Sequence, residues 1–317
     1  AGLVLALAAA HVPASAAGPS LPSTNIPWLT AAADADADRA LAQARSSKKP
    51  VLLYWGAKWC PPCNQLKATL FNRQDFIERS KAVVPVNIDG DLPGAQKLGA
   101  RFKVGGYPTL VLFTPDGREI TRLPGEADAP QVVALLQQGL AGGRPVKAAL
   151  ADARAGKALS SGEWRALALY SWDTDQDQLV AEAERPALLA QLSAKCPATE
   201  RDASTRLLLK ALANSDEGKG LKADAKLRER VRKVLADPAA SRAQIDTLVN
   251  YAADITKVLA PDAGAERRAL VSQYEAALRR LETDQTLSRA DRLGALSGRV
   301  DLARLGAAKA ELHPKIE

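Results

Sequence analysis

Blocks of apolar residues alternate with polar ones through the first half of the chain, and their spacing predicts an α/β order. Residues 34–49 begin with alternating aspartates and end with basic residues, the charge order that a helix dipole favours. The apolar run at 50–56 is typical of a buried strand, and residues 64–71 have the spacing of a helix. Residues 82–89 predict another strand, in which Pro85 favours an edge position or a bulge.

The alternation continues to residue 140. Residues 92–102 predict a short helix, and residues 104–123 place two apolar runs on either side of the turn sequence TPDG at 114–117. Such a turn between apolar runs predicts a β-hairpin. The elements together predict a compact α/β layer fold. A closing helix is expected at 129–140, with one apolar face made of Val132, Val133, Leu136 and Leu140.

From about residue 146 the pattern becomes helical throughout. Capping-box sequences recur there, pairing Ser160 with Glu163, Ser241 with Gln244, and Ser288 with Asp291. We therefore predict an all-helical domain at 146–317, and a repeat array stays an open alternative because we find no fixed period. An i, i+4, i+7 apolar stripe, which by default forms core, comprises Leu270, Tyr274, Ala277, Leu278 and Leu281.

The N-terminal stretch AGLVLALAAAHVPASAAGPS is apolar and rich in alanine, and it passes through the small-residue sequence Ala14-Ser15-Ala16. This pattern is typical of a signal peptide with its cleavage site. We expect residues 1–17 to be a signal peptide remnant and the mature chain to be periplasmic or secreted, in a bacterium. The alternative is a disordered alanine-rich leader. Residues 18–143 then form the α/β domain.

Composition narrows the classes of function. Apolar residues make up 47% of the chain and charged residues 25%, which is typical of a soluble globular protein. The net charge of +7 is spread evenly, with no basic stripe and few aromatic residues beside the basic ones. Nucleic-acid binding is therefore disfavoured.

Two cysteines, Cys60 and Cys63, stand where the strand pattern gives way to a helix pattern. A zinc site would need four ligands, and the remaining soft or imidazole candidates, Cys196, His11 and His313, show no paired spacing. A structural disulfide would close too short a loop to stabilise much. The third interpretation, a redox pair, fits the local physics best, and no metal or cofactor is expected.

The redox interpretation rests on the helix start. Unpaired N–H groups and the helix dipole favour a thiolate at Cys60, and the thiolate is the form that attacks a disulfide. Pro61 suits the first helical position, and Pro62 also lacks an N–H. The amide of Cys63 is therefore the nearest donor that could face the Cys60 sulfur.

The sequence WCPPC at a strand-to-helix junction, followed by GGYPTLVLF and a hairpin, resembles the thioredoxin superfamily over about residues 25–142. The resemblance implies a thioredoxin-like α/β fold, with Cys60 as the attacking cysteine and Cys63 as the resolving one. It also implies a cis peptide bond before Pro108, a substrate contact at Tyr107, and shielding of one side of the motif by Trp59.

This chain departs from the family pattern at one position. Thioredoxins commonly carry a buried acid six residues before the first cysteine, to move the proton of the resolving cysteine, and here Tyr54 stands there. A tyrosine is a poor base at neutral pH. The motif also lacks the histidine that strong oxidants and isomerases of the superfamily often carry between the cysteines, which favours a reductase slightly.

The sequences KKPVLLYWGAKWC and NQLKATLFNRQDFIERSKAVVPVNID resemble the thioredoxin-like module of membrane thiol–disulfide interchange reductases. We expect an exported reductase of protein disulfides, with protein thiols and disulfides as partners and a membrane reductase as a possible electron donor. The alternatives are a non-catalytic binding module with a passive disulfide, and a disulfide oxidase or isomerase.

Cys196 is a buried small hydrophobe or a reactive thiol, and the oligomeric state is left open.

Overall fold

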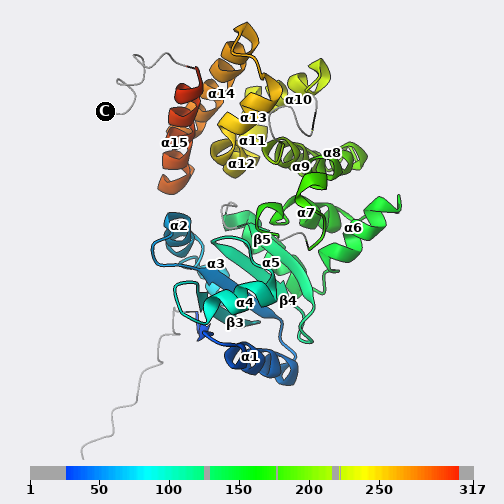
Figure 1. The fold of residues 1–317 in the computed structure, drawn as a ribbon, viewed down its shortest axis with the longest axis vertical. Coiled ribbons are helices and arrows are strands. Elements are labelled where there is room, and N and C mark those ends of the chain that lie inside the picture. The colour runs from blue at the N-terminus through cyan, green and yellow to red at the C-terminus, as the bar shows by residue number, and fades with distance from the viewer. Residues whose placement is uncertain (1–25, 125–128, 176–177, 216–220, 222, 307–317) are drawn as a thin grey trace, which may run out of the picture.

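The computed structural model describes residues 26–124, 129–175, 178–215, 221 and 223–306 (Figure 1). The predicted leader at 1–17 and both histidines lie outside these residues. In the first half the elements are β1 Leu29–Thr30, α1 Asp34–Ser47, β2 Val51–Gly56, α2 Pro61–Thr69, α3 Gln74–Ser80, β3 Val84–Asp89, α4 Ala95–Phe102, β4 Thr109–Phe113, β5 Glu119–Pro124 and α5 Ala129–Leu140.

The described part after residue 145 is helical, apart from one isolated β-bridge between Val104 and Asp175. Its elements are α6 Val146–Arg154, α7 Ser161–Ala168, the 3-10 turns η1 Trp172–Thr174 and η2 Glu182–Glu184, α8 Arg185–Lys195, α9 Arg201–Ala213, α10 Ala225–Ala236, α11 Pro238–Ala243, α12 Ile245–Asn250, α13 Ala252–Leu259, α14 Ala265–Thr283 and α15 Arg289–Gly306.

The described strands form one mixed sheet in the order β1-β3-β2-β4-β5. Strands β1, β3 and β2 are parallel, and β4 and β5 complete the sheet as an antiparallel hairpin. The hairpin turn contains Gly117 with φ +86°, a conformation that glycine adopts without strain. The predicted helix–strand order and hairpin are thus confirmed, while β1 and α3 were not predicted.

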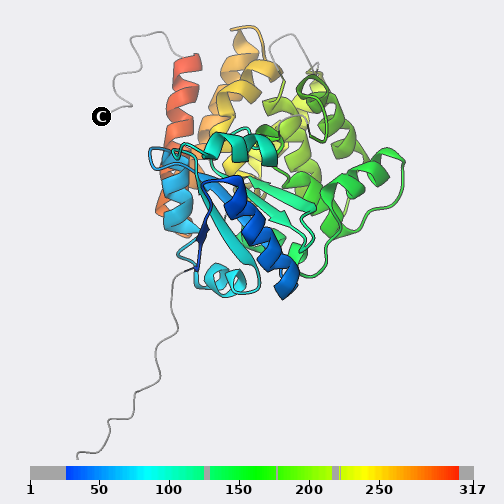
Figure 2. The ribbon, with the colours of Figure 1, turned by 60° about the horizontal axis from the view of Figure 1, so that its bottom comes forward.

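Both faces of the sheet are covered by helices. Alternate residues of β2 point to opposite faces of the sheet. Leu53 and Trp55 face α1 and α4, whereas Leu52 and Tyr54 face α2, α3 and α5. Figure 2 shows α1, in dark blue, lying across its face of the sheet. Because both faces are buried, the central strands read as continuous apolar runs rather than as alternating patterns.

The predicted edge position of Pro85 is wrong. Strand β3 lies between β1 and β2, and no bulge accompanies the proline in the pairing of β3 with β2. The amide of Val84 donates to the carbonyl of Pro50 on the β2 side, so the nitrogen of Pro85 faces the β1 side. There β1 pairs only with Val86 and Asn87, and no ladder hydrogen bond is lost at Pro85.

The helical part shares a core with the sheet. The apolar cluster under β2 and β4 continues through Leu150, Trp164, Leu189 and Leu207 of α6 to α9, while a second cluster fills the space among α9 to α15. The predicted stripe on α14 is buried in the second cluster. The division of the chain at residues 143–146 stays a prediction, and a continuous apolar cluster crosses it.

Two of the three predicted capping boxes mark helix starts. Ser160 accepts from the amide of Glu163, and Ser288 accepts from the amide of Asp291 at 3.1 Å. The prediction for Ser241 with Gln244 is wrong, because Ser241 lies inside α11 and its hydroxyl donates to the carbonyl of Asp237. Asp237 itself caps that helix, in front of Pro238 at the first turn.

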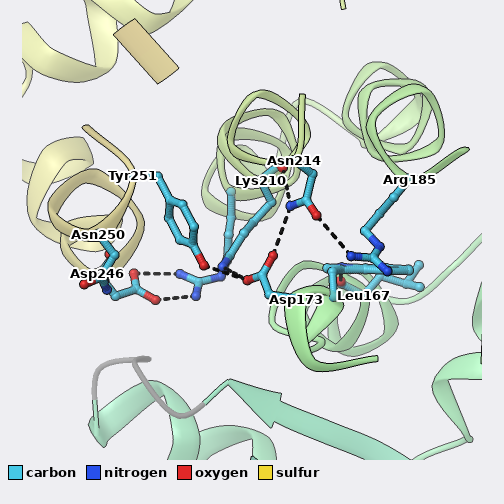
Figure 3. A network of polar contacts seen from close by, with 10 residues as sticks. Leu167, Asp173, Arg185, Lys210, Asn214, Asp246, Asn250 and Tyr251 are labelled. Atoms are coloured by element: carbon cyan, nitrogen blue, oxygen red, sulfur yellow. Dashed lines mark hydrogen bonds and ion pairs between the residues drawn. The ribbon is translucent and has the colours of Figure 1, made fainter. Parts of the chain in front are cut away.

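A buried polar network joins the helices of the second half (Figure 3). Arg206 and Asp246 form a two-pronged ion pair with both side chains about 3% exposed. Lys210 pairs with Asp173 at 2.5 Å, and the Tyr251 hydroxyl donates to the same carboxylate at 2.9 Å. The network ties η1 to α9 and to the α12–α13 region.

Candidate redox site

The site is built where β2 ends and α2 begins. Cys60 and Cys63 form a disulfide, and Cys60 is the N-cap of α2 with extended backbone angles. Pro61 occupies the first helical position. The amide of Cys63 donates to Cys60 Sγ at 3.2 Å, so the predicted donor is confirmed. This amide and the positive end of the helix would favour a thiolate on Cys60 once the disulfide is reduced.

Tyr107 and Trp59 border the disulfide. Both cysteines are buried in a small cluster with Ala57, against which Tyr107 packs. The Tyr107–Pro108 peptide bond is cis. The Tyr107 ring meets Trp59 edge-on with centroids 5.9 Å apart. The structure therefore brings the two cysteines, Trp59 and Tyr107 together, and the roles of Trp59, Tyr107 and Pro108 toward a substrate stay predictions.

Trp59 is 69% exposed, yet its orientation is defined. Its indole Nε1 donates to Asp91 Oδ1 at 2.8 Å, and the backbone amide of Lys58 donates to the other oxygen of the same carboxylate at 3.2 Å. Trp55 is buried and stacks on Tyr107, so it belongs to the core behind the site.

The sequence analysis missed Asp91. A signal was available, because Asp91 follows β3 by two residues, and β3 runs parallel to β2. The carboxyl ends of neighbouring parallel strands meet at the same edge of a sheet, which is where α/β folds place their sites. Asp91 positions Trp59 beside the disulfide.

Tyr54 occupies the position of the usual buried acid. Its side chain is buried under α2, and its hydroxyl has no hydrogen-bond partner among the described residues. Burial, and secondarily the charge of Asp89, raises the pKa of Tyr54 to about 12. The hydroxyl therefore stays protonated at neutral pH and cannot serve as a base for Cys63.

We expect Tyr54→Phe to leave the free energy of unfolding unchanged or raise it by about 1 kcal/mol, because a buried hydroxyl without a partner destabilises the folded state. We also expect insulin reduction at pH 7 to stay within about twofold of the wild-type rate, because a protonated phenol takes up no proton. Urea unfolding and initial rates test the two statements. A tenfold slower variant would show that the hydroxyl takes part in proton transfer.

Cys196 ends α8 and lies apart from the motif in sequence and in fold. Its side chain packs against the shared core, and its Sγ donates to the carbonyl of Glu200 at 3.6 Å. Burial, with the nearby Glu200 charge, raises the pKa of Cys196 to about 11. This environment favours the small-hydrophobe interpretation over the reactive thiol.

The described residues contain no group of three or more histidine, cysteine, aspartate or glutamate side chains placed to hold a metal ion. None of their helices combines the length and the apolar character that crossing a membrane requires.

Residues 37–140 match the family model of a thioredoxin-like domain. Thioredoxin of Chlamydia caviae is 34% identical over 88 residues, which cover 28% of this chain and 80% of that protein. The chain belongs to the thioredoxin superfamily. The match to this superfamily ends before α6.

Other relatives share the thioredoxin-like segment. The thiol:disulfide interchange protein DsbD 1 of Pseudomonas aeruginosa is 35% identical over 122 residues, which cover 37% of this chain and 20% of that protein. The chain thus spans about a fifth of the length of this relative. The solution structure of a thioredoxin from Thermus thermophilus is 28% identical, with a TM-score of 0.30, covering 32% of this chain and 81% of that one. Superfamily membership and the CxxC disulfide together support thiol–disulfide oxidoreductase activity.

Proposed function

We propose that the chain is an exported thiol–disulfide oxidoreductase that reduces protein disulfides through Cys60 and Cys63. The observation that carries the proposal is the amide of Cys63 on the Cys60 sulfur at the start of α2. A donor and a helix N-terminus at one sulfur stabilise the thiolate, and a thiolate is the nucleophile of disulfide exchange. Cys60 is therefore the attacking cysteine and Cys63 the resolving one.

The reaction proceeds in two exchanges. The Cys60 thiolate attacks one sulfur of the substrate disulfide, forms a mixed disulfide, and releases the other substrate sulfur as a thiolate. Cys63 then loses its proton and attacks Cys60 Sγ, which closes the Cys60–Cys63 disulfide and releases the second substrate thiolate. Two electrons pass from the dithiol to the substrate, and solvent protonates the released thiolates.

Three neighbouring groups support the chemistry. Tyr107 packs against the cluster of the two cysteines, and we propose that an extended substrate segment lies beside Tyr107 and Pro108. Trp59 directly precedes Cys60 and its indole donates to Asp91, and we propose that its ring shields one side of the motif. The adjacent prolines Pro61 and Pro62 restrict the motif backbone.

The reducing direction and the export are part of the proposal. The motif has no histidine between its cysteines, and the leader at 1–17 has the pattern of a signal peptide. A reductase in an oxidising compartment needs a source of electrons. We assign that role to a membrane reductase, in keeping with the similarity to the interchange protein of Pseudomonas aeruginosa.

The test is the reduction of insulin disulfides by dithiothreitol. The wild-type chain is expected to accelerate the reaction catalytically, and a double variant, Cys60→Ala with Cys63→Ala, is expected not to. A wild-type chain that leaves the rate at that of dithiothreitol alone would overturn the proposed activity.

A further inference from the structure

A groove of about 910 Å³ runs between the redox helix and the helical region. Residues of α2 form one wall, and α11, α12 and the start of α15 form the other. Figure 1 shows the start of α15 next to α2, although more than 200 residues separate them in sequence. The lining includes Pro62, Leu66 and Ala68 on one side and Ile245, Leu287 and Ala290 on the other. Pro62 belongs to the redox motif, so one residue between the two cysteines lines the groove.

The charged side chains that line the groove are matched by partners of the protein itself. Arg73 pairs with Asp75 at 2.8 Å, and Arg242 pairs with Asp284. Asp291 accepts from the hydroxyl of Ser288 at 2.7 Å, and Asp246 is held in its buried pair. A phosphate or another small ion would have to displace these contacts. The lining thus favours a neutral occupant.

The remaining lining is apolar or carries uncharged hydrogen-bonding groups. Gln65 and Asn250 contribute amides, which can donate to and accept from peptide groups, among the apolar side chains of both walls. Apolar side chains interspersed with a few such groups are typical of surfaces that bind polypeptide segments.

Large exposed apolar side chains occur just before α2 and on α15, outside the residues that line the groove. Trp59, 69% exposed, directly precedes the motif, while Leu293 and Leu296, 54% and 37% exposed, lie on α15. Among the described residues, only Leu29 joins them as a large hydrophobic side chain with comparable exposure.

We infer that this groove binds the polypeptide segment adjoining the disulfide that Cys60 attacks. The inference rests on the proposed function and adds to it a role for the helical region. A substrate protein whose cystine reaches Cys60 must lay its adjoining chain against the surface around the motif. Pro62 of the motif lines the groove together with later residues of α2. The helical region thereby selects proteins over small disulfides.

The test fills the groove and compares two substrates. Ala68 is an exposed alanine on α2, and Ala68→Trp places a large ring in the groove without removing a contact of the motif. The matched control is Ala42→Trp, an exposed alanine of α1 on the far side of the sheet. Insulin serves as the protein substrate, and bis(2-hydroxyethyl) disulfide serves as the small one.

We expect Ala68→Trp to lower kcat/KM for insulin by at least about fivefold, mainly through KM, because the ring occupies space that the substrate chain needs. The small disulfide should be reduced within about twofold of the wild-type rate by both variants, since it does not extend into the groove. Equal insulin rates for Ala68→Trp and Ala42→Trp would overturn the inference.

A second variant, on the opposite wall, controls for the case in which Ala68→Trp disturbs the structure of α2 itself. Ala290→Trp fills the groove from α15 and leaves the redox helix unchanged. If neither tryptophan variant slows insulin more than the small disulfide, the inference is wrong. A wild-type dimer in light scattering that Ala68→Trp converts to a monomer would assign the groove to a second copy, which also overturns it. A wild-type chain that reduces neither substrate would refute the proposed function instead.

Discussion

Cys60→Ser is expected to reduce the rate of insulin reduction to that of dithiothreitol alone. A serine hydroxyl stays protonated at neutral pH and cannot form a disulfide, so the first exchange has no nucleophile. Cys63 cannot replace Cys60, because Cys60 holds the N-cap position of α2 and accepts the amide hydrogen bond that stabilises a thiolate. Insulin turbidity followed over time measures the loss.

Two matched variants sharpen this prediction. Cys63→Ser should keep the first exchange and accumulate a mixed disulfide between Cys60 and the substrate, visible on a non-reducing gel. Cys196→Ser should retain the wild-type rate within about twofold, because burial raises the pKa of this thiol to about 11 and keeps it protonated. Activity retained by Cys60→Ser, or lost in Cys196→Ser, would contradict the assignment of the reacting sulfurs.

Asp246→Ala is expected to lower the free energy of unfolding by about 3–5 kcal/mol, because it leaves the buried Arg206 guanidinium without its carboxylate partner. Both side chains of the pair are about 3% exposed, so water cannot take over the lost contacts. Urea unfolding followed by circular dichroism measures the change. Asp301→Ala, which breaks an exposed ion pair with Arg304 on α15, is the control and should change stability by less than about 1 kcal/mol.

The same pair gives stability a defined pH dependence. Burial alone would raise the pKa of Asp246, but the charge and hydrogen bonds of Arg206 outweigh it and lower the pKa below 3.8. Because the folded pKa is lowered, the stabilisation is present above the ordinary carboxyl pKa and is lost as the pH falls through the folded value. Equal stability losses for Asp246→Ala and Asp301→Ala at pH 7 would show that the buried pair contributes little.

The sequence predicted those features that depend on local pattern. The helix at Asp34–Ser47, the strand at Val51–Gly56 and the hairpin turn follow from charge order, apolar runs and turn residues, and all three are present. The contact from the Cys63 amide to the Cys60 sulfur was also predictable, since two prolines leave a single nearby donor at the start of α2.

Other features of the fold depend on contacts between segments that lie far apart in the sequence, so no short stretch of residues predicts them. Strand β1 has two residues, too few for any alternation, and α3 has seven, of which only Phe76, Ile77 and Ser80 are buried. The place of Pro85 inside the sheet follows from the short length of β1, which a pattern within β3 cannot show. Ser241 and Gln244 match a capping box, yet Asp237 and Pro238 start that helix earlier.

The residues of the candidate site also fall into two groups: those that sequence motifs indicate, and those whose contacts depend on tertiary packing. The cysteines, Trp59 and Tyr107 were found from motifs, whereas the Asp91 contact to Trp59 depends on strands β2 and β3 running side by side. The groove between α2 and α15 depends on the packing of α6 to α9 against the sheet, which carries the later helices over the redox helix. No pattern in the helical half indicates that placement.

The reduction potential of the Cys60–Cys63 pair, measured by equilibration with glutathione, decides whether the chain reduces protein disulfides. The account predicts a value near that of thioredoxin, about −270 mV, as a reductase of protein disulfides requires. A value near that of the strongest oxidants of the superfamily, about −120 mV, would make the chain a disulfide donor and contradict the proposed direction. A pair that stays oxidised below about −300 mV would be a structural disulfide and would contradict the redox role itself.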